Sequence, residues 1–421
     1  MQTQVVIVGG GPAGTGLAIS LKKLGIKCII VEKAEFPRLH VGESLTGECG
    51  ASVRALGLEM DMAKNHYPIK WGTMVYGADG RHSFYIPVMG RDKENKLFKQ
   101  CTWQVRRSQF DKMLLDVCAD QDITTVKGAA TDVLRNDKGT PCGVKYKNDA
   151  GEETEIHAAF VADASGQNTF LRNKGVTSER LMGKYDKQLA IFSHFKRAER
   201  KVVEGHPLQP DDTLIFYQKR NHWAWFIPID DELVSIGVVT PSEYYRSKHE
   251  NTKDFLLREM KSLNPELLKR LDDAEMVEDV HSCANYSYQI KKFGGPGFLC
   301  IGDAHRFIDP IFSLGLHFTL VECRKAADAI ADYLSGKTAD LANPFEEHMK
   351  FCEVGMDNIQ VLLDVFWDYP FAFSLYIKNA KYRDGFIDLF AGRCYVTDPP
   401  ACITALRKLQ VEGAAQEAMA S

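Results

Sequence analysis

A glycine-rich turn between a strand and a helix, near the start of the chain, narrows the possible folds more than any other feature. Residues 5–33 read VVIVGGGPAGTGLAISLKKLGIKCIIVEK, which alternates a buried strand, a turn, a periodic helix and a second strand. Gly9, Gly11 and Gly14 have the spacing G-x-G-x-x-G. In such a turn the first glycine permits the tight bend, the second admits a pyrophosphate close to the backbone, and the third lets the helix pack against the strand. The sequence therefore predicts a Rossmann-type βαβ unit in an α/β fold.

The same segment predicts the binding of a dinucleotide. The helix after the turn presents free N–H groups and a partial positive charge at its N-terminus, where phosphates bind. Glu32 ends the second strand, where an acidic side chain can accept hydrogen bonds from both ribose hydroxyls. The residues predicted to contact the dinucleotide are Gly9, Gly11, Pro12, Ala13, Gly14, Glu32 and Lys33.

The bulk composition excludes several classes of protein. The chain has 421 residues, enough for one large domain or for a few smaller ones that share a site. Its formal net charge of −4 argues against a nucleic-acid binder and a polybasic membrane anchor, and no apolar run is long enough to span a membrane. The eleven cysteines include no C-x-x-C pair, which predicts reduced thiols rather than disulfides or a metal site. Because the chain opens directly on a strand, without a signal peptide, we expect a cytoplasmic protein.

Three further segments resemble FAD enzymes of the aromatic-hydroxylase type. Gly302 and Asp303 follow a strand, and in those enzymes such a pair places its carboxylate on the ribityl chain of the flavin. Residues 160–172 contain the turn Asp-Ala-Ser-Gly that follows a strand in those enzymes. Residues 104–120 resemble a helix that an arginine opens beside the cofactor, here Arg107. The resemblance implies FAD as the cofactor, with Arg107, Gly302 and Asp303 among its contacts.

The order of these motifs predicts a discontinuous FAD-binding domain with a second domain inserted. Strand-like runs separated by turn signals fill the inserted region and predict an antiparallel β-sheet on the substrate side. After Asp340 the pattern is helical, and it is unusually aromatic over 361–377, a stretch that can be core, a cap over the pocket, a dimer face or a partner site. The predicted parts are the FAD-binding domain (1–75, 101–180 and 280–335), the sheet domain (76–100 and 181–279) and a helical C-terminal cap region (336–421).

Four motifs indicate one branch of this superfamily. Residues 223–228, WAWFIP, match W-x-W-x-I-P, and residues 307–315, FIDPIFSLG, match F-x-x-P-x-x-S-x-G. Residues 36–45, FPRLHVGESL, contain a Gly-Glu-Ser after the second strand, and residues 69–77, IKWGTMVYG, contain a lysine in the pattern K-x-G. In these stretches the chain resembles the flavin-dependent halogenases, in particular the branch that acts on pyrroles, phenols or carrier-bound substrates.

The resemblance implies a catalytic role for three residues. Lys70 would be the essential lysine of the family, which either hydrogen-bonds hypohalous acid or forms a haloamine and then delivers the halogen. A buried lysine with a lowered pKa suits either step. Trp223 and Trp225 alternate along a strand and so share one face, where they either form a rigid wall between flavin and substrate or belong to the sheet core.

The resemblance also implies a halide site at the start of the helix that follows FIDPIFSLG. There the backbone N–H groups of Leu314 and Gly315, next to Ser313, would hold an anion against the flavin. The family more often has Ser or Thr where this chain has Leu314, so one hydroxyl contact is absent. Pro310 and Gly315 complete the expected cofactor contacts.

The sequence therefore predicts an enzyme that halogenates an electron-rich aromatic ring with reduced FAD, oxygen and chloride or bromide. The ring would be a phenol or pyrrole, free or tethered to a carrier protein, and a separate flavin reductase would supply the reduced FAD. The alternatives are an FAD-dependent aromatic monooxygenase, an oxidoreductase like geranylgeranyl reductase, and a flavoprotein without catalytic activity. Neither alternative enzyme needs Lys70. The substrate, the halide and the oligomeric state do not follow from the sequence.

Overall fold

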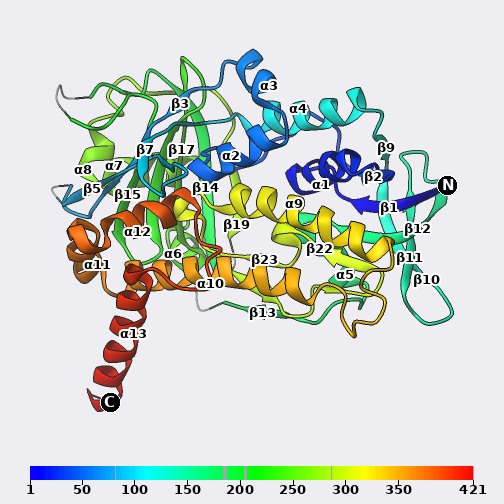
Figure 1. Cartoon of the computed structure of the whole chain (residues 1–421). Helices are drawn as coiled ribbons and strands as arrows, with labels where there is room; N and C mark the ends of the chain where they lie inside the picture. Colours follow the sequence, from blue (N-terminus) through cyan, green and yellow to red (C-terminus); the bar gives the residue numbers. More distant parts are fainter. Residues whose placement is uncertain (81, 184–186, 203–205, 286, 421) are drawn as a thin grey trace.

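The glycine-rich segment folds as predicted, in the order β1 (Gln2–Val8), α1 (Pro12–Lys23) and β2 (Cys28–Glu32). The computed structural model describes residues 1–421 apart from 81, 184–186, 203–205, 286 and 421 (Figure 1). β1 and β2 pair in parallel, with Val5 opposite Cys28. Their central residues are buried, as expected for strands inside an α/β domain.

The first sheet has eight strands and carries the nucleotide end of the molecule. Its other strands are β9 (Thr124–Lys127), β10 (Ala129–Arg135), β11 (Pro141–Lys147), β12 (Glu153–Asp163), β21 (Gly294–Gly295) and β22 (Phe298–Cys300). The order is β10-β11-β12-β1-β2-β9, with β22 on β12 and β21 on β22. β1, β12 and β22 are parallel neighbours, so their carboxyl ends meet at one edge, where ligands bind in open α/β sheets.

The second sheet also has eight strands and forms the other half of the molecule (Figure 1). They are β4 (Gly72–Tyr76), β5 (Ser83–Pro87), β14 (Gln188–Lys196), β15 (Thr213–Lys219), β16 (His222–Pro228), β17 (Leu233–Pro241), β18 (Glu275–Met276) and β19 (His281–Asn285). The order is β18-β14-β17-β16-β15-β4-β5, with β19 also on β14. The predicted antiparallel pairing is confirmed in every pair except β4 with β15, which is parallel.

The second sheet extends beyond the limits that the sequence predicted for the sheet domain. β4 begins before residue 76 and β19 follows residue 279, yet both pair into this sheet. A strand joins a sheet edge where its backbone N–H and C=O groups find hydrogen-bond partners. The sequence of a short apolar run does not show which sheet edge offers those partners. Seven further short strands form small ribbons: β3 (Ile69–Lys70) with β8 (Thr102–Trp103), β6 (Met89–Arg91) with β7 (Leu97–Lys99), and β13 (Arg180–Met182), β20 (Tyr288–Ile290) and β23 (Arg306–Phe307) together.

Helices flank both sheets and fill the C-terminal part of the chain. Those before residue 270 are α2 (Gly47–Ala55), α3 (Glu59–Lys64), α4 (Arg107–Asp120), α5 (Phe170–Asn173), α6 (Ser242–Ser247), α7 (Thr252–Ser262) and α8 (Pro265–Leu268). The later ones are α9 (Gly315–Leu334), α10 (Glu346–Asp368), α11 (Pro370–Lys378), α12 (Ala380–Ala391) and α13 (Ala401–Ala420). Short 3-10 turns lie at η1 (Gly166–Asn168), η2 (Gly302–Ala304) and η3 (Pro310–Phe312).

β16 separates two hydrophobic cores because its side chains alternate. Trp223, Trp225 and Ile227 belong to the core shared with the C-terminal helices. Ala224 and Phe226 point to the opposite face and belong to the core covered by α7 and α8. The two tryptophans therefore do share one face, and their ring centroids are 5.9 Å apart.

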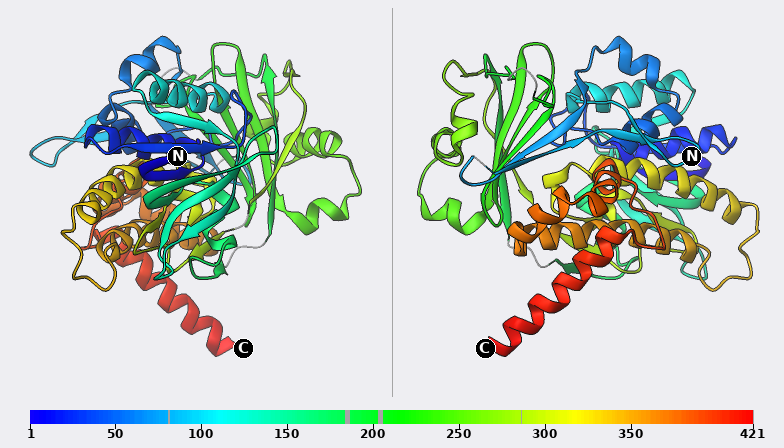
Figure 2. Two further views of the ribbon diagram at one scale, coloured as in Figure 1. Left: turned by 90° about the vertical axis from the view of Figure 1, so that its right-hand side faces the viewer. Right: turned by 60° about the vertical axis from the view of Figure 1, so that its left-hand side comes forward.

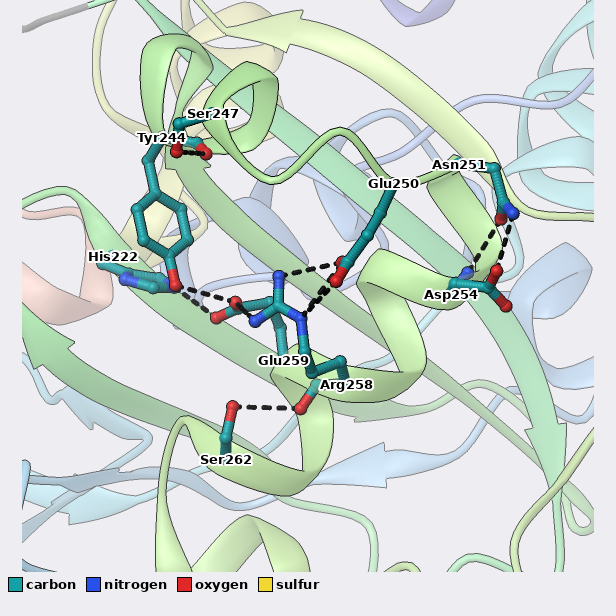
Figure 3. Close-up of polar contacts among 9 residues, drawn as sticks. All are labelled: His222, Tyr244, Ser247, Glu250, Asn251, Asp254, Arg258, Glu259 and Ser262. Carbon is teal, nitrogen blue, oxygen red and sulfur yellow. Dashed lines mark hydrogen bonds and ion pairs between the residues drawn. The ribbon is translucent and has the colours of Figure 1, made fainter.

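A polar network on the outer face ties the start of β16 to α7 (Figure 3). Glu259 binds His222 at 2.8 Å, accepts a hydrogen bond from the Tyr244 hydroxyl at 3.0 Å, and pairs with Arg258. Arg258 also donates to Glu250 at 3.0 Å. Burial alone would raise the pKa of Glu259, but the hydrogen bonds and charges of His222 and Arg258 lower it. The network fixes one end of the strand that carries the tryptophans.

The aromatic stretch 361–377 lies in α10 and α11 and belongs mainly to the core. Phe366 packs edge-on against Tyr217 of the second sheet, and Phe373 packs against Phe84, with centroids 5.3 and 5.9 Å apart. Phe371 stays exposed on α11. Figure 2 shows α13 extending away from the remaining helices. Among the residues that the structure describes, no helix is long and apolar enough to cross a membrane.

Candidate active site

The glycine turn is shaped so that only glycine fits at two of its positions. Gly9 has φ +110°, and a Cβ there would lie 2.4 Å from the carbonyl oxygen of Ala164, at the end of β12. A Cβ on Gly14 would lie 1.8 Å from the carbonyl oxygen of Gly9. α1 then begins at Pro12 with Gly11 as its N-cap and without a side-chain cap, so its first N–H groups remain available to a phosphate.

Glu32 reaches back to the glycine turn from the end of β2. Its carboxylate accepts hydrogen bonds from the backbone N–H groups of Gly10 and Ala34, both at 2.5 Å. The side chain is 8 % exposed, whereas Lys33 next to it is exposed. The glycine cradle, the uncapped helix and this carboxylate fit the pyrophosphate and ribose of a dinucleotide.

Asp163 ends β12, the neighbour of β1, and Asp303 follows β22, which pairs with the other edge of β12. The buried Asp163 carboxylate accepts from the N–H groups of Ser165 and Leu171, and so shapes the predicted Asp-Ala-Ser-Gly turn. Asp303 lies in η2 directly after β22, and its carbonyl oxygen accepts from the Tyr288 hydroxyl at 2.5 Å. Burial raises the pKa of the Asp303 carboxyl to about 6, and the charge of Arg107 opposes that rise. The predicted FAD contacts thus meet at one edge of the first sheet.

Arg107, in the first turn of α4, contacts the loop between β2 and α2. It is 5 % exposed and makes a two-pronged ion pair with Asp111 at 2.8 and 3.0 Å. Its Nη1 donates to the carbonyl oxygens of Val41 at 2.7 Å and Gly42 at 3.3 Å. Through this contact Arg107 positions the loop that leads to the Gly-Glu-Ser motif, a role that the sequence did not reveal.

The predicted halide segment forms a sharp turn at the start of α9. Pro310 opens η3, which Asp309 caps by accepting from the N–H of Ile311 at 3.0 Å. Ser313 has φ +58°, and α9 starts at Gly315 with no side-chain cap. The Leu314 side chain is buried in the hydrophobic core. A ligand at this turn would therefore meet the backbone of Leu314 rather than its side chain. The turn therefore offers backbone donors at a helix N-terminus.

Lys70 lies at the end of β3 and is only 4 % exposed. Its Nζ donates to the Ser44 hydroxyl at 2.7 Å and to the Leu45 carbonyl oxygen at 3.1 Å. Burial lowers the pKa of the Lys70 ammonium to about 8, while the charge of Asp212 opposes that change. The lysine is therefore present as both ammonium and amine near neutral pH.

One pocket brings Lys70 and the halide turn together. Lys70 and Ser313 both line it, together with Thr46 at the start of α2, Ile215 of β15 and Phe312 of η3. The C-terminal helices contribute as well, because Phe390 and Ala391 at the end of α12 close one side.

Trp223 and Trp225 are not among the residues that line this pocket. They are 3 % and 4 % exposed and belong to the same hydrophobic core as Phe312 and Leu314 of the predicted halide turn. Trp225 donates to the Ser235 hydroxyl at 3.0 Å. The structure places the tryptophans in the sheet core, behind the pocket lining, so the wall role stays a prediction.

Sequence reasoning missed the residues that support Lys70. The Ser44 hydroxyl contacts the Thr213 hydroxyl at 2.7 Å, and Thr213 also accepts from Gln104 at 2.9 Å. Asp212 accepts from the N–H groups that follow Lys70 and sets the bend between β3 and β4. Ser44 had a signal in the Gly-Glu-Ser motif, but Thr213 and Asp212 come from a distant strand and had none.

Residues 2–342 match the family described as FAD binding domain, and the chain belongs to it. A 1H-pyrrole-2-carbonyl-(peptidyl-carrier protein) brominase of Pseudoalteromonas luteoviolacea is 38% identical over 391 residues, which cover 93% of this chain and 92% of the relative. The chlorinase with the corresponding name from Pseudomonas fluorescens is 29% identical, over 93% of this chain and 89% of its own length. The structure of the flavin-dependent brominase Bmp2 matches with a TM-score of 0.90 and 37% identity, over 99% of this chain and 100% of the other.

The FAD-dependent fold defines the class, and these full-length similarities define the branch within it. The chain belongs to the flavin-dependent halogenases, enzymes that use FAD and a halide. The myxobacterial chondrochloren halogenase CndH shares the fold more distantly, with a TM-score of 0.76 and 26% identity over 97% of this chain and 96% of the other.

Proposed function

We propose that this halogenase modifies a pyrrole ring held as an acyl thioester on a peptidyl carrier protein, and that Lys70 passes the oxidised halogen to the ring. The observation that supports the proposal is that Lys70 and Ser313 line the same pocket, so the buried lysine and the turn proposed to bind halide face one space. The substrate follows from the two similar enzymes of matching length, both named for a pyrrole-2-carbonyl group on a carrier protein.

The residues that would hold FAD are the glycine turn, Glu32 and the η2 loop with Asp303. When bound in its reduced form, FAD supplies the oxidation of halide by oxygen. The protein's own task near it is to hold the anion and to keep water out. The uncapped N–H groups of Leu314 and Gly315 bind chloride or bromide, and the apolar side chains of Phe312 and Leu314 exclude water behind them.

Lys70 acts after the halide has been oxidised to hypohalous acid. Two of its hydrogen-bonding positions are taken by Ser44 and Leu45, which leaves one N–H or the lone pair for the pocket. As an amine, Lys70 forms an N–halogen bond while the oxygen–halogen bond breaks, and water leaves with the amine proton. As an ammonium, it donates a hydrogen bond to the oxygen of hypohalous acid and so polarises the oxygen–halogen bond. Either way the pyrrole carbon takes the halogen and loses its proton.

The paired indoles are proposed to keep the ring apart from the flavin. A Cβ on Gly237 of the neighbouring strand β17 would lie 2.3 Å from the Trp225 ring, so a glycine is needed there to leave room for the indole. Ser235 holds the same ring through its Nε1. Because Trp223 packs on Trp225, the two indoles form one unit within the core that also holds Phe312 and Leu314.

Two further parts of the proposal concern the enzyme's surroundings. A separate flavin reductase is proposed as the source of reduced FAD, which is compatible with the single glycine fingerprint for a dinucleotide in the chain. A cytoplasmic location is supported by the eleven cysteines, which are free in the structure, and carrier proteins would be available there.

The substrate is tested by intact-mass analysis with a flavin reductase, NADH, oxygen and either bromide or chloride. Pyrrole-2-carbonyl carrier protein, free pyrrole-2-carboxylate and benzoyl carrier protein are compared under the same conditions. A halogen isotope pattern on the tethered pyrrole alone supports the proposal. Equal halogenation of the free acid refutes the carrier requirement. Addition of oxygen without halogen identifies a monooxygenase, and saturation of a double bond in isoprenoid substrates identifies a reductase.

A further inference from the structure

A buried cluster of metal-binding side chains lies apart from the Lys70 pocket, under the η2 loop. It consists of His305 just after η2, Glu322 on α9, and His348 and Cys352 on α10. His305, Glu322 and Cys352 each offer a ligand atom, and these atoms all lie within 4.8 Å of one another. The Cys352 sulfur is in turn 3.4 Å from Nε2 of His348. Four side chains that can bind a metal ion therefore lie close together, although they come from three separate segments of the chain.

We propose that these four residues bind one structural zinc ion, through Nε2 of His305, the Glu322 carboxylate, Nε2 of His348 and the thiolate of Cys352. A tetrahedral site with ordinary Zn–N, Zn–O and Zn–S bonds needs its ligand atoms about 3.3–3.7 Å apart. The distance of 3.4 Å between Nε2 of His348 and the Cys352 sulfur already approaches this, while Nε2 of His305 lies 3.0 Å from Oε2 of Glu322, the carboxylate oxygen that also accepts from Gly302. His348 and Cys352 are spaced i,i+4, which puts both on one helix face, as in zinc-binding helices.

The charge of the cluster fits a divalent ion. All four side chains are buried, with exposed fractions of 7 % or less. A thiolate, a carboxylate and two neutral imidazoles around Zn²⁺ sum to zero charge, which is the arrangement a buried site requires. The mixture of nitrogen, sulfur and oxygen donors favours zinc over magnesium or calcium.

An unpartnered atom inside the cluster points to a missing ligand. Among the described residues, Oε1 of Glu322 is buried without a hydrogen-bond partner, and it is the oxygen proposed to bind the ion. The other carboxylate oxygen of Glu322 accepts from the backbone N–H of Gly302 at 2.8 Å, which fixes the carboxylate's orientation and leaves Oε1 for the ion. Buried polar groups are costly when unpaired, and coordination would satisfy Oε1.

The site would join the FAD-binding loop to the C-terminal helices. Glu322 holds Gly302, the residue before Asp303, while His348 and Cys352 belong to α10, whose later turns pack behind the halide turn. Loss of the ion is therefore expected to loosen the η2 loop. No sequence motif marks this site, because its ligands are scattered along the chain and lack the C-x-x-C spacing.

The test is the zinc content of the full-length protein, purified without a metal-binding tag from zinc-supplemented medium. Cys352→Ser is compared with Cys118→Ser, which changes another fully buried cysteine on α4, outside the cluster. We expect about one zinc ion per chain in the wild type and in Cys118→Ser, and at least about a tenfold loss in Cys352→Ser. Equal zinc contents in all three proteins, or no zinc in the wild type, would overturn the proposal.

A cobalt spectrum keeps the test decisive if Cys352→Ser does not fold. The wild type grown with Co²⁺ in place of Zn²⁺ should show a thiolate-to-cobalt charge-transfer band and visible bands of a tetrahedral ion. The difference spectrum between cobalt-loaded and zinc-loaded protein cancels the absorption of any flavin. Glu322→Gln should shift these bands while retaining the thiolate band. Cobalt bound without a thiolate band would refute the assignment of Cys352.

Discussion

The burial of Lys70 predicts that its replacement by methionine makes the folded protein more stable while abolishing halogenation. Burial lowers the pKa of Lys70 from 10.5 to about 8, which means that the folded state holds the charged form poorly. A functional lysine in such a place opposes folding at neutral pH, and methionine fills a similar volume without a charge.

The size of the effect follows from the pKa values. One unit of pKa corresponds to 1.36 kcal/mol, so at about pH 7 the buried charge destabilises the fold by about 3 kcal/mol. Methionine leaves the Ser44 hydroxyl and the Leu45 carbonyl oxygen without the lysine's hydrogen bonds, which costs about 1–2 kcal/mol in total. The expected net gain for Lys70→Met is therefore about 1–2 kcal/mol.

The gain should depend on pH in a defined direction. Because the folded pKa lies below the unfolded one, the destabilisation is complete below the folded pKa of about 8 and disappears as pH rises to 10.5. At about pH 10 less than 1 kcal/mol of it remains, so the advantage of methionine should vanish.

Thermal unfolding of the two proteins, with equal FAD, checks this prediction. Lys70→Met should melt about 1–2 °C above the wild type at about pH 7 and no higher than it at about pH 10. Lys253→Met, on the exposed surface of α7, serves as the control and should leave the melting temperature unchanged. If Lys70→Met is less stable than the wild type at neutral pH, or if its gain in stability persists at high pH, the buried charge of Lys70 does not destabilise the fold.

Three other perturbations test the surrounding structure. Gly9→Ala puts a Cβ 2.4 Å from a backbone oxygen and should weaken FAD binding at least about tenfold in a fluorescence titration, since the phosphate turn must shift. Glu259→Gln should lower the free energy of unfolding, measured with urea, by about 1–3 kcal/mol at neutral pH. Because the pKa of Glu259 is lower in the folded than in the unfolded protein, this loss of stability should shrink as the pH falls below the pKa of the unfolded state. FAD affinity of the wild type should fall as pH drops through about 6, where Asp303 gains a proton, and Asp303→Asn should abolish this dependence in the same titration.

The local parts of the fold could be predicted because their signals are local. The spacing of Gly9, Gly11 and Gly14 and the acid at Glu32 specify a turn within one βαβ unit, and the structure contains it. The alternation of Trp223 and Trp225 likewise fixed their common face. By contrast, the parallel pairing of β4 with β15 and the entry of β19 into the second sheet depend on contacts between distant segments.

The site was predictable to the extent that motifs mark single residues. The K-x-G and F-x-x-P-x-x-S-x-G patterns pointed to Lys70 and Ser313, which the structure places in one pocket. The support from Thr213 and Asp212 arises because β15 packs beside the start of β4, a long-range contact without a sequence signature. For the same reason the convergence of His305, Glu322, His348 and Cys352 emerged only from the folded chain.

The most direct test of the central claim separates halide oxidation from halogen delivery in one experiment. Reduced FAD is mixed with oxygen, bromide, pyrrole-2-carbonyl carrier protein and either the wild type or Lys70→Ala, and flavin reoxidation is followed alongside the intact mass of the carrier. We predict that both proteins reoxidise the flavin at similar rates and that only the wild type adds bromine to the pyrrole. Bromination by Lys70→Ala at the wild-type rate would contradict the assignment of Lys70 as the residue that delivers the halogen.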